Sequence, residues 1–271
     1  MTPRIPAPAA VVVPGGCEAA DTPVVAGPAR SVGLTRAVEV LGRFWARVSA
    51  TVPDLSVAVL LAALAAAALL VLLPSTWRAT RHAVTIAHEG AHGLVALAAG
   101  RRLSGIRLHS DTSGLTVSAG KPTGLGMVLT CAAGYTGPGL FGLGAAALLA
   151  AGHAIGLLWA LLALLALLLV QIRNWYGLWS VLVTGAVVFA ATWWLPPEGQ
   201  AVFAAVATWF LLLAAPRTVL ELQSSRRRRR APDSDADQLA ALTPFPALFW
   251  VGVFLLVDVG ALLLGARWLL T

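Results

Sequence analysis

Residues 85–100 read TIAHEGAHGLVALAAG and combine two features that rarely occur together. His88, Glu89 and His92 fit the pattern H-E-x-x-H, in which two histidines bind a zinc ion and the glutamate acts as a general base in hydrolysis. The flanking residues are alanine, valine, leucine and glycine, as in a helix buried in a bilayer. The stretch therefore indicates either a water-consuming site inside a membrane or an accidental match in an apolar helix.

Composition favours a membrane protein. Hydrophobic residues make up 58% of the 271 residues and charged residues only 11%, whereas a soluble domain has about 25% charged residues. An apolar block of about 20 residues is long enough to cross a bilayer as a helix. We therefore predict an all-α polytopic membrane protein with about seven transmembrane helices. The predicted spans lie at residues 55–73, 83–99, 124–172 (two spans), 175–195, 200–220 and 245–266.

Charged residues orient the predicted spans. With seven spans, all of the 19 Lys and Arg residues except Arg78, Arg81 and Arg267 fall on one side. Positively charged residues accumulate on the cytoplasmic side of membrane proteins. The distribution predicts a multi-pass protein of the cell inner (plasma) membrane with a cytoplasmic N-terminus and an outer C-terminus. The run of arginines at 226–230 then anchors a cytoplasmic loop, and we expect no nucleic-acid partner.

The chain divides into five predicted regions. Residues 1–32 are rich in Pro and Ala and predict a disordered cytoplasmic tail, and 33–52 predict an interfacial amphipathic helix. Residues 53–222 form the membrane core, 223–244 a cytoplasmic Arg-rich and acidic loop, and 245–271 the last transmembrane helix. Within the loop, Ser234 precedes an acidic turn and is a candidate helix cap.

The H-E-x-x-H pattern makes chemical sense on a helix. Residues i and i+4 share a face, so His88 and His92 can present ring nitrogens to one Zn²⁺ ion, while Glu89 can take a proton from the attacking water. The alternative is a pair of histidines bonded across helices, with Glu89 paired to an arginine. Ionisable groups inside a membrane are costly and usually functional, so the metal interpretation is favoured.

Three further segments follow the motif in a characteristic order. Residues 105–120 (GIRLHSDTSGLTVSAG) alternate like a short β-hairpin, residues 132–144 (AAGYTGPGLFGLG) are rich in glycine, and RNWYG occupies 173–177. The glycines of 132–144 match G-x-G-x-x-G, but no strand precedes them, so they predict close helix packing instead of a dinucleotide site. The order resembles the shorter bacterial branch of the site-2 protease family of intramembrane zinc metallopeptidases.

The third metal ligand is left open by the sequence. The resemblance implies an aspartate in an LDG motif, but the chain contains no LDG, and Asn174 occupies the corresponding place. An amide is a poor zinc ligand beside a carboxylate. Asp258 is the alternative, because it lies about as deep in its predicted span as His92 does in its own. Glu221, at the membrane edge, is a weaker candidate.

The resemblance implies a zinc metalloendopeptidase that cuts a membrane-embedded substrate helix. His88, His92 and a third group would hold the metal, and Glu89 would be catalytic. Its partners would be a transmembrane protein substrate and the lipid bilayer. Two other functions remain open: a catalytically inactive relative that binds or regulates membrane proteins, and a small transporter whose His and Asp residues carry protons or metal ions.

Overall fold

The structure is a computed structural model that describes residues 29–228 and 233–271. Most of the predicted disordered tail therefore lies outside the described residues. The chain separates into two units, Met1–Phe44 and Trp45–Thr271. Helix α1 (Ala29–Val48) covers most of the predicted interfacial segment and carries a Glu39–Arg43 ion pair of 3.8 Å one helical turn apart. Its position at a membrane interface stays a prediction.

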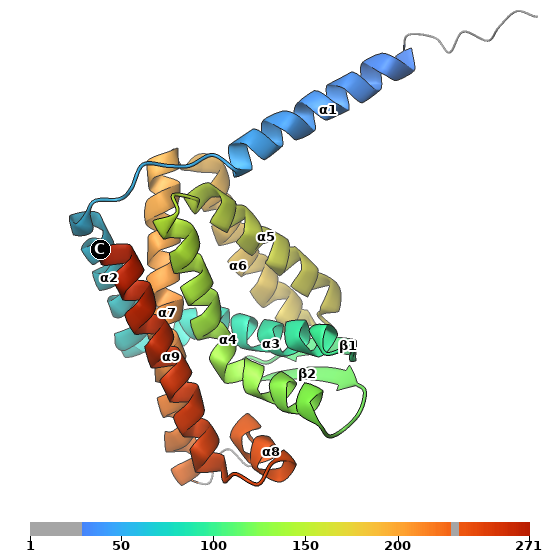
Figure 1. Cartoon of the computed structure of the whole chain (residues 1–271), viewed down its shortest axis with the longest axis vertical. Coiled ribbons are helices and arrows are strands. Elements are labelled where there is room, and N and C mark those ends of the chain that lie inside the picture. The colour runs from blue at the N-terminus through green and yellow to red at the C-terminus, as the bar shows by residue number, and fades with distance from the viewer. Residues whose placement is uncertain (1–28, 229–232) are drawn as a thin grey trace, which may run out of the picture. The chain divides into compact units, whose positions relative to one another are not determined.

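The second unit is built from helices and one small sheet (Figure 1). The helices are α2 (Val57–Leu72), α3 (Pro74–Ala98), α4 (Leu125–Ala150), α5 (Ala154–Gln171), α6 (Trp175–Trp194), α7 (Pro197–Arg227), α8 (Asp235–Leu242) and α9 (Ala247–Leu270). Strands β1 (Arg102–Leu108) and β2 (Gly114–Ala119) pair antiparallel between α3 and α4. The predicted hairpin after the motif helix is thereby confirmed.

Pro74 breaks the first predicted pair of spans. Leu73, directly before it, is extended (φ −75°, ψ 129°), because a residue that precedes proline is disfavoured in the helical region. Helices α2 and α3 are therefore bent by 97° and together make one broken span or a re-entrant loop. The motif helix α3 crosses the direction of α7 and α9 (Figure 1).

Among the described residues, fewer helices than predicted are long and apolar enough to cross a membrane. Four qualify by themselves, namely α5, α6, α7 and α9, or five if the bent pair counts as one span. Helix α4 does not, since glycines lower its hydropathy. The seven predicted spans are not confirmed. The physical causes are the bend at Pro74 and the composition of α4.

Helix α4 lies at the centre of the second unit and packs against α3, α7 and α9. Its glycines allow the close approach. A Cβ at Gly137 would collide with the side chain of Ala91 in α3, and one at Gly142 would lie 3.0 Å from Leu212 in α7. The predicted packing role of the glycine-rich segment, including contact with the motif helix, is confirmed.

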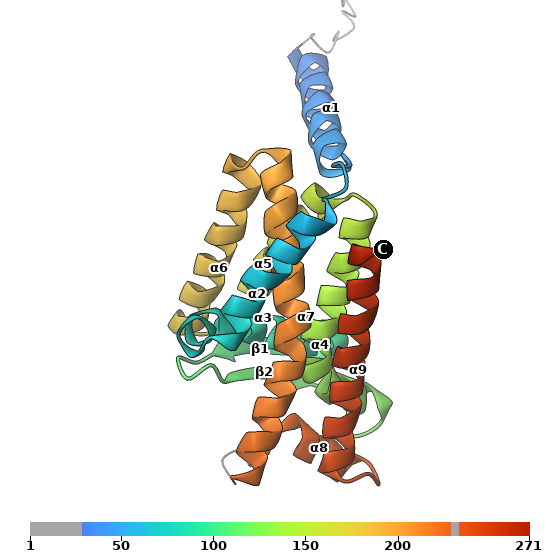
Figure 2. The ribbon, with the colours of Figure 1, turned by 90° about the vertical axis from the view of Figure 1, so that its left-hand side faces the viewer.

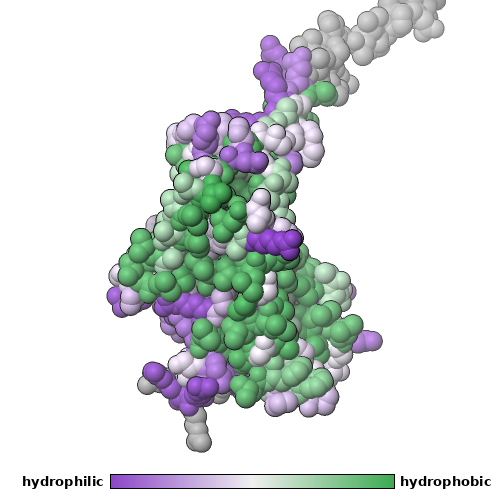
Figure 3. Space-filling view, turned by 60° about the vertical axis from the view of Figure 1, so that its left-hand side comes forward, coloured by the Kyte–Doolittle hydropathy of each residue, from purple (hydrophilic) through white to green (hydrophobic). Residues whose placement is uncertain are grey.

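The outer surface of the helices is largely apolar, and Figure 3 shows this on one face. Large hydrophobic side chains with more than half of their surface exposed occur on several helices, among them Leu167, Trp175, Leu256 and Leu263. Monomeric soluble proteins rarely expose so much apolar surface to water. The surface fits a lipid environment.

The two ends of the described membrane region lie together. Val52 and Asp54, before α2, line one cavity with Trp268 and Thr271 at the C-terminus. In Figure 2 this end is opposite α8. The sequence-based prediction put these two ends on opposite sides of the membrane. It assumed that residues 55–73 and 83–99 each cross the membrane. A single crossing by the bent pair would instead put the start of α2 and the C-terminus on the same side.

A second contact supports this revised arrangement. Arg81, near the start of α3, was predicted outside. Glu221 was predicted at the membrane edge, next to a loop assigned to the cytoplasm. In the structure, Trp77 Nε1 donates to Glu221 Oε1 at 2.7 Å, and Arg81 lies 3.5 Å from the same carboxylate. The start of α3 is therefore level with the last turns of α7.

Cysteine labelling tests the arrangement. In a Cys17→Ser background, Asp54→Cys and Thr271→Cys should react with a membrane-impermeant maleimide from the same side, and Arg228→Cys from the other side. The reason is that α2 with α3 makes a single passage. Labelling of Asp54→Cys and Thr271→Cys from opposite sides would show that α2 and α3 cross separately.

Candidate metal centre

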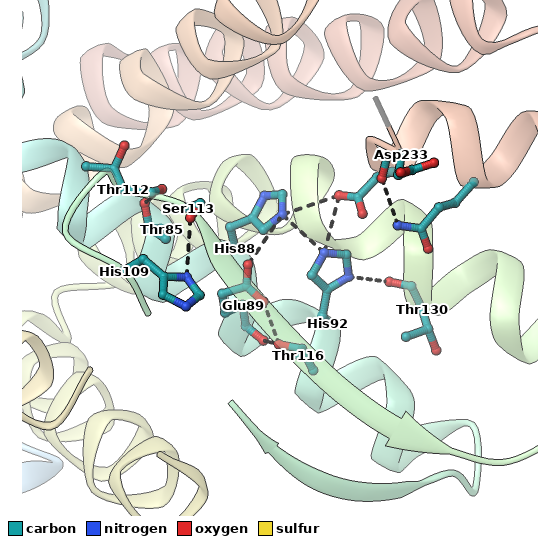
Figure 4. Close-up of polar contacts among 12 residues, drawn as sticks. Thr85, His88, Glu89, His92, His109, Thr112, Ser113, Thr116, Thr130 and Asp233 are labelled. Atoms are coloured by element: carbon teal, nitrogen blue, oxygen red, sulfur yellow. Dashed lines mark hydrogen bonds and ion pairs between the residues drawn. The ribbon is translucent and has the colours of Figure 1, made fainter. Parts of the chain in front are cut away.

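Helix α3 places the two motif histidines side by side. His88 and His92 are one turn apart, and their Nε2 atoms lie 3.1 Å from each other (Figure 4). His92 is buried, with 8% of its surface exposed, and the side chain of His88 is 20% exposed. Two histidines spaced i, i+4 point to the same side of a helix, as the sequence predicts.

The second ring nitrogen of His92, Nδ1, is held by a backbone carbonyl. Nδ1 lies 2.6 Å from the carbonyl oxygen of Thr130 in α4. A carbonyl only accepts hydrogen bonds, so Nδ1 carries a proton and Nε2 is the nitrogen that can face a metal ion. This arrangement is typical of a metal-binding histidine, whose second nitrogen donates to a backbone or carboxylate oxygen. Gly134, one turn further along α4, leaves no room for a Cβ beside the two imidazoles.

Asp235, the first residue of α8, completes the group. Its Oδ2 atom lies 3.3 Å from Nε2 of His88 and 3.3 Å from Nε2 of His92. Its side chain is 14% exposed, and Oδ2 is buried and accepts no well-aligned hydrogen bond from any described residue. Among the described residues, these three form the one group of His, Cys, Asp or Glu side chains close enough to share a metal ion.

The spacing of the three atoms fits a tetrahedral zinc ion. Nitrogen and oxygen ligands lie about 2.0–2.2 Å from zinc, so two ligands of a tetrahedron are roughly 3.3–3.4 Å apart. The observed separations of 3.1, 3.3 and 3.3 Å approach this value. Three ligands also leave a fourth position open, as catalytic zinc sites require. The residues present therefore fit a catalytic zinc ion.

The contacts of α8 hold Asp235 in place. Ser234 is the N-cap of α8, as the sequence suggests, and its hydroxyl donates to Asp237 Oδ2 at 2.5 Å. Arg226 of α7 donates to Asp237 Oδ1 at 2.6 Å. The Arg226 guanidinium holds the pKa of Asp237 below its usual value. Burial alone would raise the pKa of Asp235, but the neighbouring His92 and His88 lower it well below the usual range.

Sequence reasoning missed Asp235. The residue was assigned to a cytoplasmic loop, because it follows the arginine run and precedes the last apolar block. The available signal was the acidic first turn of a short capped helix, DSDAD at 233–237. That pattern is common in exposed loops, and only the packing of α8 against α4 and α9 brings it to the histidines.

Asn174, predicted as the third ligand, has a different place in the structure. Its Nδ2 donates to the carbonyl of Leu108 at 2.6 Å, and its Oδ1 accepts from the Leu108 amide at 3.2 Å. The side chain thus continues the backbone pairing of β1 at the start of α6. Both polar atoms of the amide are engaged there, so the structure brings Asp235 rather than Asn174 to the histidines.

Asp258 and Glu221, the other candidates, are also outside the group. Asp258 is fully buried in α9 against Gly139 of α4, and neither carboxylate oxygen has a hydrogen-bond partner among the described residues. Glu221 accepts from Trp77 and Arg217. Equal depth in the membrane, the argument for Asp258, does not ensure that two side chains point toward each other.

Glu89 lies beside the group and is held by the hairpin. It is 4% exposed, and its Oε1 atom is 4.0 Å from Nε2 of His88. Thr116 of β2 donates to Glu89 Oε2 at 2.6 Å (Figure 4). Gly114, two residues earlier, is so close to the carboxylate that a Cβ would overlap it. The hairpin therefore orients the carboxylate toward the histidines.

A model of one protein family matches most of the chain. The family model described as peptidase M50B-like matches residues 61–265, which include α3, the hairpin and α8. The chain belongs to this family. The match confirms the predicted membership in the site-2 protease family, and with the apolar helices it identifies a multi-pass membrane protein of a metallopeptidase family. No curated protein and no solved structure matches the chain.

The role of Asn174 can be separated from metal binding. Asn174→Ala removes both hydrogen bonds to Leu108, and leaving backbone groups unsatisfied costs about 1–3 kcal/mol each. We expect a lower free energy of unfolding and a lower thermal midpoint in detergent, with the zinc content of the protein unchanged. Loss of zinc without loss of stability would instead make Asn174 a ligand.

Proposed function

We propose that the protein is a zinc-dependent endopeptidase that hydrolyses a peptide bond in a membrane-embedded substrate helix. The observation that carries the proposal is the convergence of His88, His92 and Asp235 on one point beside Glu89. Two histidines, one carboxylate and an adjacent glutamate are the components of a hydrolytic zinc site. Family membership supports the same chemistry.

Each side chain has a defined task in this proposal. A bound zinc ion would act as a Lewis acid that polarises the scissile carbonyl and acidifies the attacking water. His88, His92 and Asp235 would hold the ion, and the bond from His92 to Thr130 would keep the ring oriented. Glu89 would accept the proton of the water and deliver it to the leaving nitrogen. Thr116 would hold one carboxylate oxygen and leave the other directed at the reacting atoms.

The substrate follows from the surroundings of the site. The histidines lie on a helix between apolar helices, so a substrate arrives from the bilayer and not from water. A helix in lipid has its backbone hydrogen bonds closed internally and must unwind before its peptide bond can be attacked. Segments containing Gly, Ser or Pro unwind most readily. The proposed partner is therefore a transmembrane protein with such a weak helical segment.

The proposed orientation keeps most of the sequence-based topology. We place the hairpin and the end of α7 in the cytoplasm, because they and the residues beside them carry many of the positively charged residues. Helix α8 follows the end of α7 and lies on the same side in this proposal. Thr271 is then outside, as predicted. The start of α2 borders the same cavity as Thr271, so we place it outside as well. The predicted cytoplasmic position of the N-terminus stays a prediction. The proposed location is the cell inner (plasma) membrane.

An inactive relative was the main alternative, and its basis was the missing third ligand. Asp235 supplies a carboxylate at the required distance from both histidines. No observation on the described residues favours the inactive relative or a transporter over the peptidase.

Zinc analysis tests the ligand set. The purified protein should bind about one zinc ion per chain, because three donors converge on one open-sided site. His88→Ala, His92→Ala and Asp235→Ala should each lose most of the zinc, since each removes one of the three ligands. Asp258→Asn and Glu221→Gln are the controls and should retain it. Retention of zinc by Asp235→Ala would refute the assignment of the third ligand.

Product analysis tests the reaction. Wild-type protein should cut a reconstituted transmembrane substrate within its membrane segment, next to Gly, Ser or Pro. Glu89→Gln should keep its zinc and lose activity by a factor of at least about 100, the lower range for a general base. Mass spectrometry locates the cut. Cleavage confined to soluble loops outside the bilayer would contradict an intramembrane reaction even if zinc is bound.

A further inference from the structure

We propose that the outer face of the hairpin binds the headgroup of an anionic phospholipid between Arg107 and Arg173. The two arginines border a cleft of about 280 Å³ on the sheet. The cleft is lined by Ser104, Gly105, Arg107, Leu115, Val117 and Arg173. Two cations thus flank a floor formed by Leu115 and Val117, and the lining contains no acidic side chain. This arrangement suits a ligand with a negative group next to apolar chains.

Both arginines have N–H groups available for a ligand. Arg107 is exposed, and its side chain makes no hydrogen bond or ion pair to any residue in the described ranges 29–228 and 233–271. Arg173 donates from one terminal nitrogen to the carbonyls of Val170 and Ile172, at 2.7 and 3.1 Å. A guanidinium has five N–H donors, so most of those of Arg173 remain free. Planar guanidinium groups bind the oxygens of phosphate in pairs.

The stem of Arg173 is fixed by the hairpin. Gly105 has a φ of +149°, and a Cβ at this position would collide with Cγ of Arg173. The backbone amide of Arg173 also donates to Ile106 at 2.9 Å. The glycine therefore lets the arginine lie across β1, where the β-bulge shifts the register of the strands. The shape of the cleft therefore depends on the close contact between Gly105 and the side chain of Arg173.

The position of the cleft matches the depth of lipid headgroups. Arg173 lies in the turn between α5 and α6, two helices that are each long and apolar enough to span a membrane. A turn between two spans lies at the membrane boundary. Trp175 and Trp179 follow it and are 86% and 68% exposed, and tryptophan is enriched at membrane–water interfaces. Lipid phosphates occupy this depth.

These observations favour a lipid over an acidic peptide. A peptide carboxylate could pair with the arginines, but the exposed apolar floor and the neighbouring tryptophans fit acyl chains entering the bilayer. Basic pockets at the cytoplasmic ends of transmembrane helices are suited to anionic headgroups. A zwitterionic lipid is disfavoured, because its choline cation would meet two unneutralised arginines.

The cleft is distinct from the metal centre. Side chains alternate along a strand, so Leu115 and Val117 point to one face of β2 and Thr116 to the other. Thr116 contacts Glu89, whereas its two neighbours line the cleft. Lipid binding therefore does not depend on the proposed peptidase activity.

Lipid titration by native mass spectrometry tests the proposal with the full-length protein in detergent. Phosphatidylglycerol should bind more tightly than phosphatidylcholine with the same acyl chains. A lysine or arginine near an anionic headgroup contributes enough that Arg107→Ala should raise the apparent Kd for phosphatidylglycerol about fivefold, and Arg107→Ala with Arg173→Ala about 30-fold. Arg102→Ala is the matched control, an exposed arginine on the same strand outside the cleft. Its Kd should equal that of the wild type.

Three outcomes would overturn the proposal. The first is equal affinity of the wild type for the two lipids, and the second is an equal loss of affinity in Arg102→Ala. The third is displacement of phosphatidylglycerol by a soluble hexaglutamate peptide, which would identify a peptide site. Arg107→Ala decides the result if loss of Arg173 disturbs the turn, because the side chain of Arg107 makes no hydrogen bond or ion pair within the described part of the chain that the substitution could break.

Discussion

The close approach of α3 to α4 is the constraint on which the rest of the structure depends. Gly134 and Gly137 leave no side chain between the two helices, so the backbone of α4 can reach the histidines of α3. The carbonyl of Thr130 then accepts from His92 and sets which ring nitrogen can face a metal ion. Any larger residue at Gly134 would displace the imidazoles themselves. The glycine-rich helix thus serves the site directly, besides packing the bundle.

Asp235, the third candidate metal ligand, comes from a part of the chain far from the H-E-x-x-H motif. Helix α8 is short, and by itself its residues would not form a stable helix in water. It is held by the Arg226–Asp237 pair and by apolar residues such as Leu239, which is fully buried. Three polar atoms brought together out of water would be costly without a common partner, because each loses hydration. A cation between them would satisfy all three.

The hairpin has two faces with different surroundings. Thr116 and Gly114 face the motif helix and fix Glu89, whereas Leu115 and Val117 face outward between two arginines. The period of two along a strand makes this division unavoidable once one face is set. A small sheet therefore connects the general base with a surface at membrane depth, and Asn174 joins that sheet to α6.

The sequence by itself determined the features that are local. The i, i+4 spacing placed His88 and His92 on one side of a helix, and the alternation after the motif indicated the hairpin, because both depend only on backbone geometry. The apolar blocks indicated a membrane protein, but they did not indicate how the blocks are divided into transmembrane spans. The seven spans are not confirmed, because Pro74 bends one pair by 97° and hydropathy does not register a change of direction. The family resemblance was also available from the residues.

The third ligand was decided by tertiary structure alone. Asn174 was suggested by its place in a resembling order and Asp258 by its depth, and neither property says where a side chain points. Asp235 lies more than 140 positions after His92 in the chain, and its approach depends on the packing of α8 against α4 and α9. A metal centre is a set of distances of a few ångströms. Such distances between helices are fixed by how side chains pack and not by the pattern within any one segment.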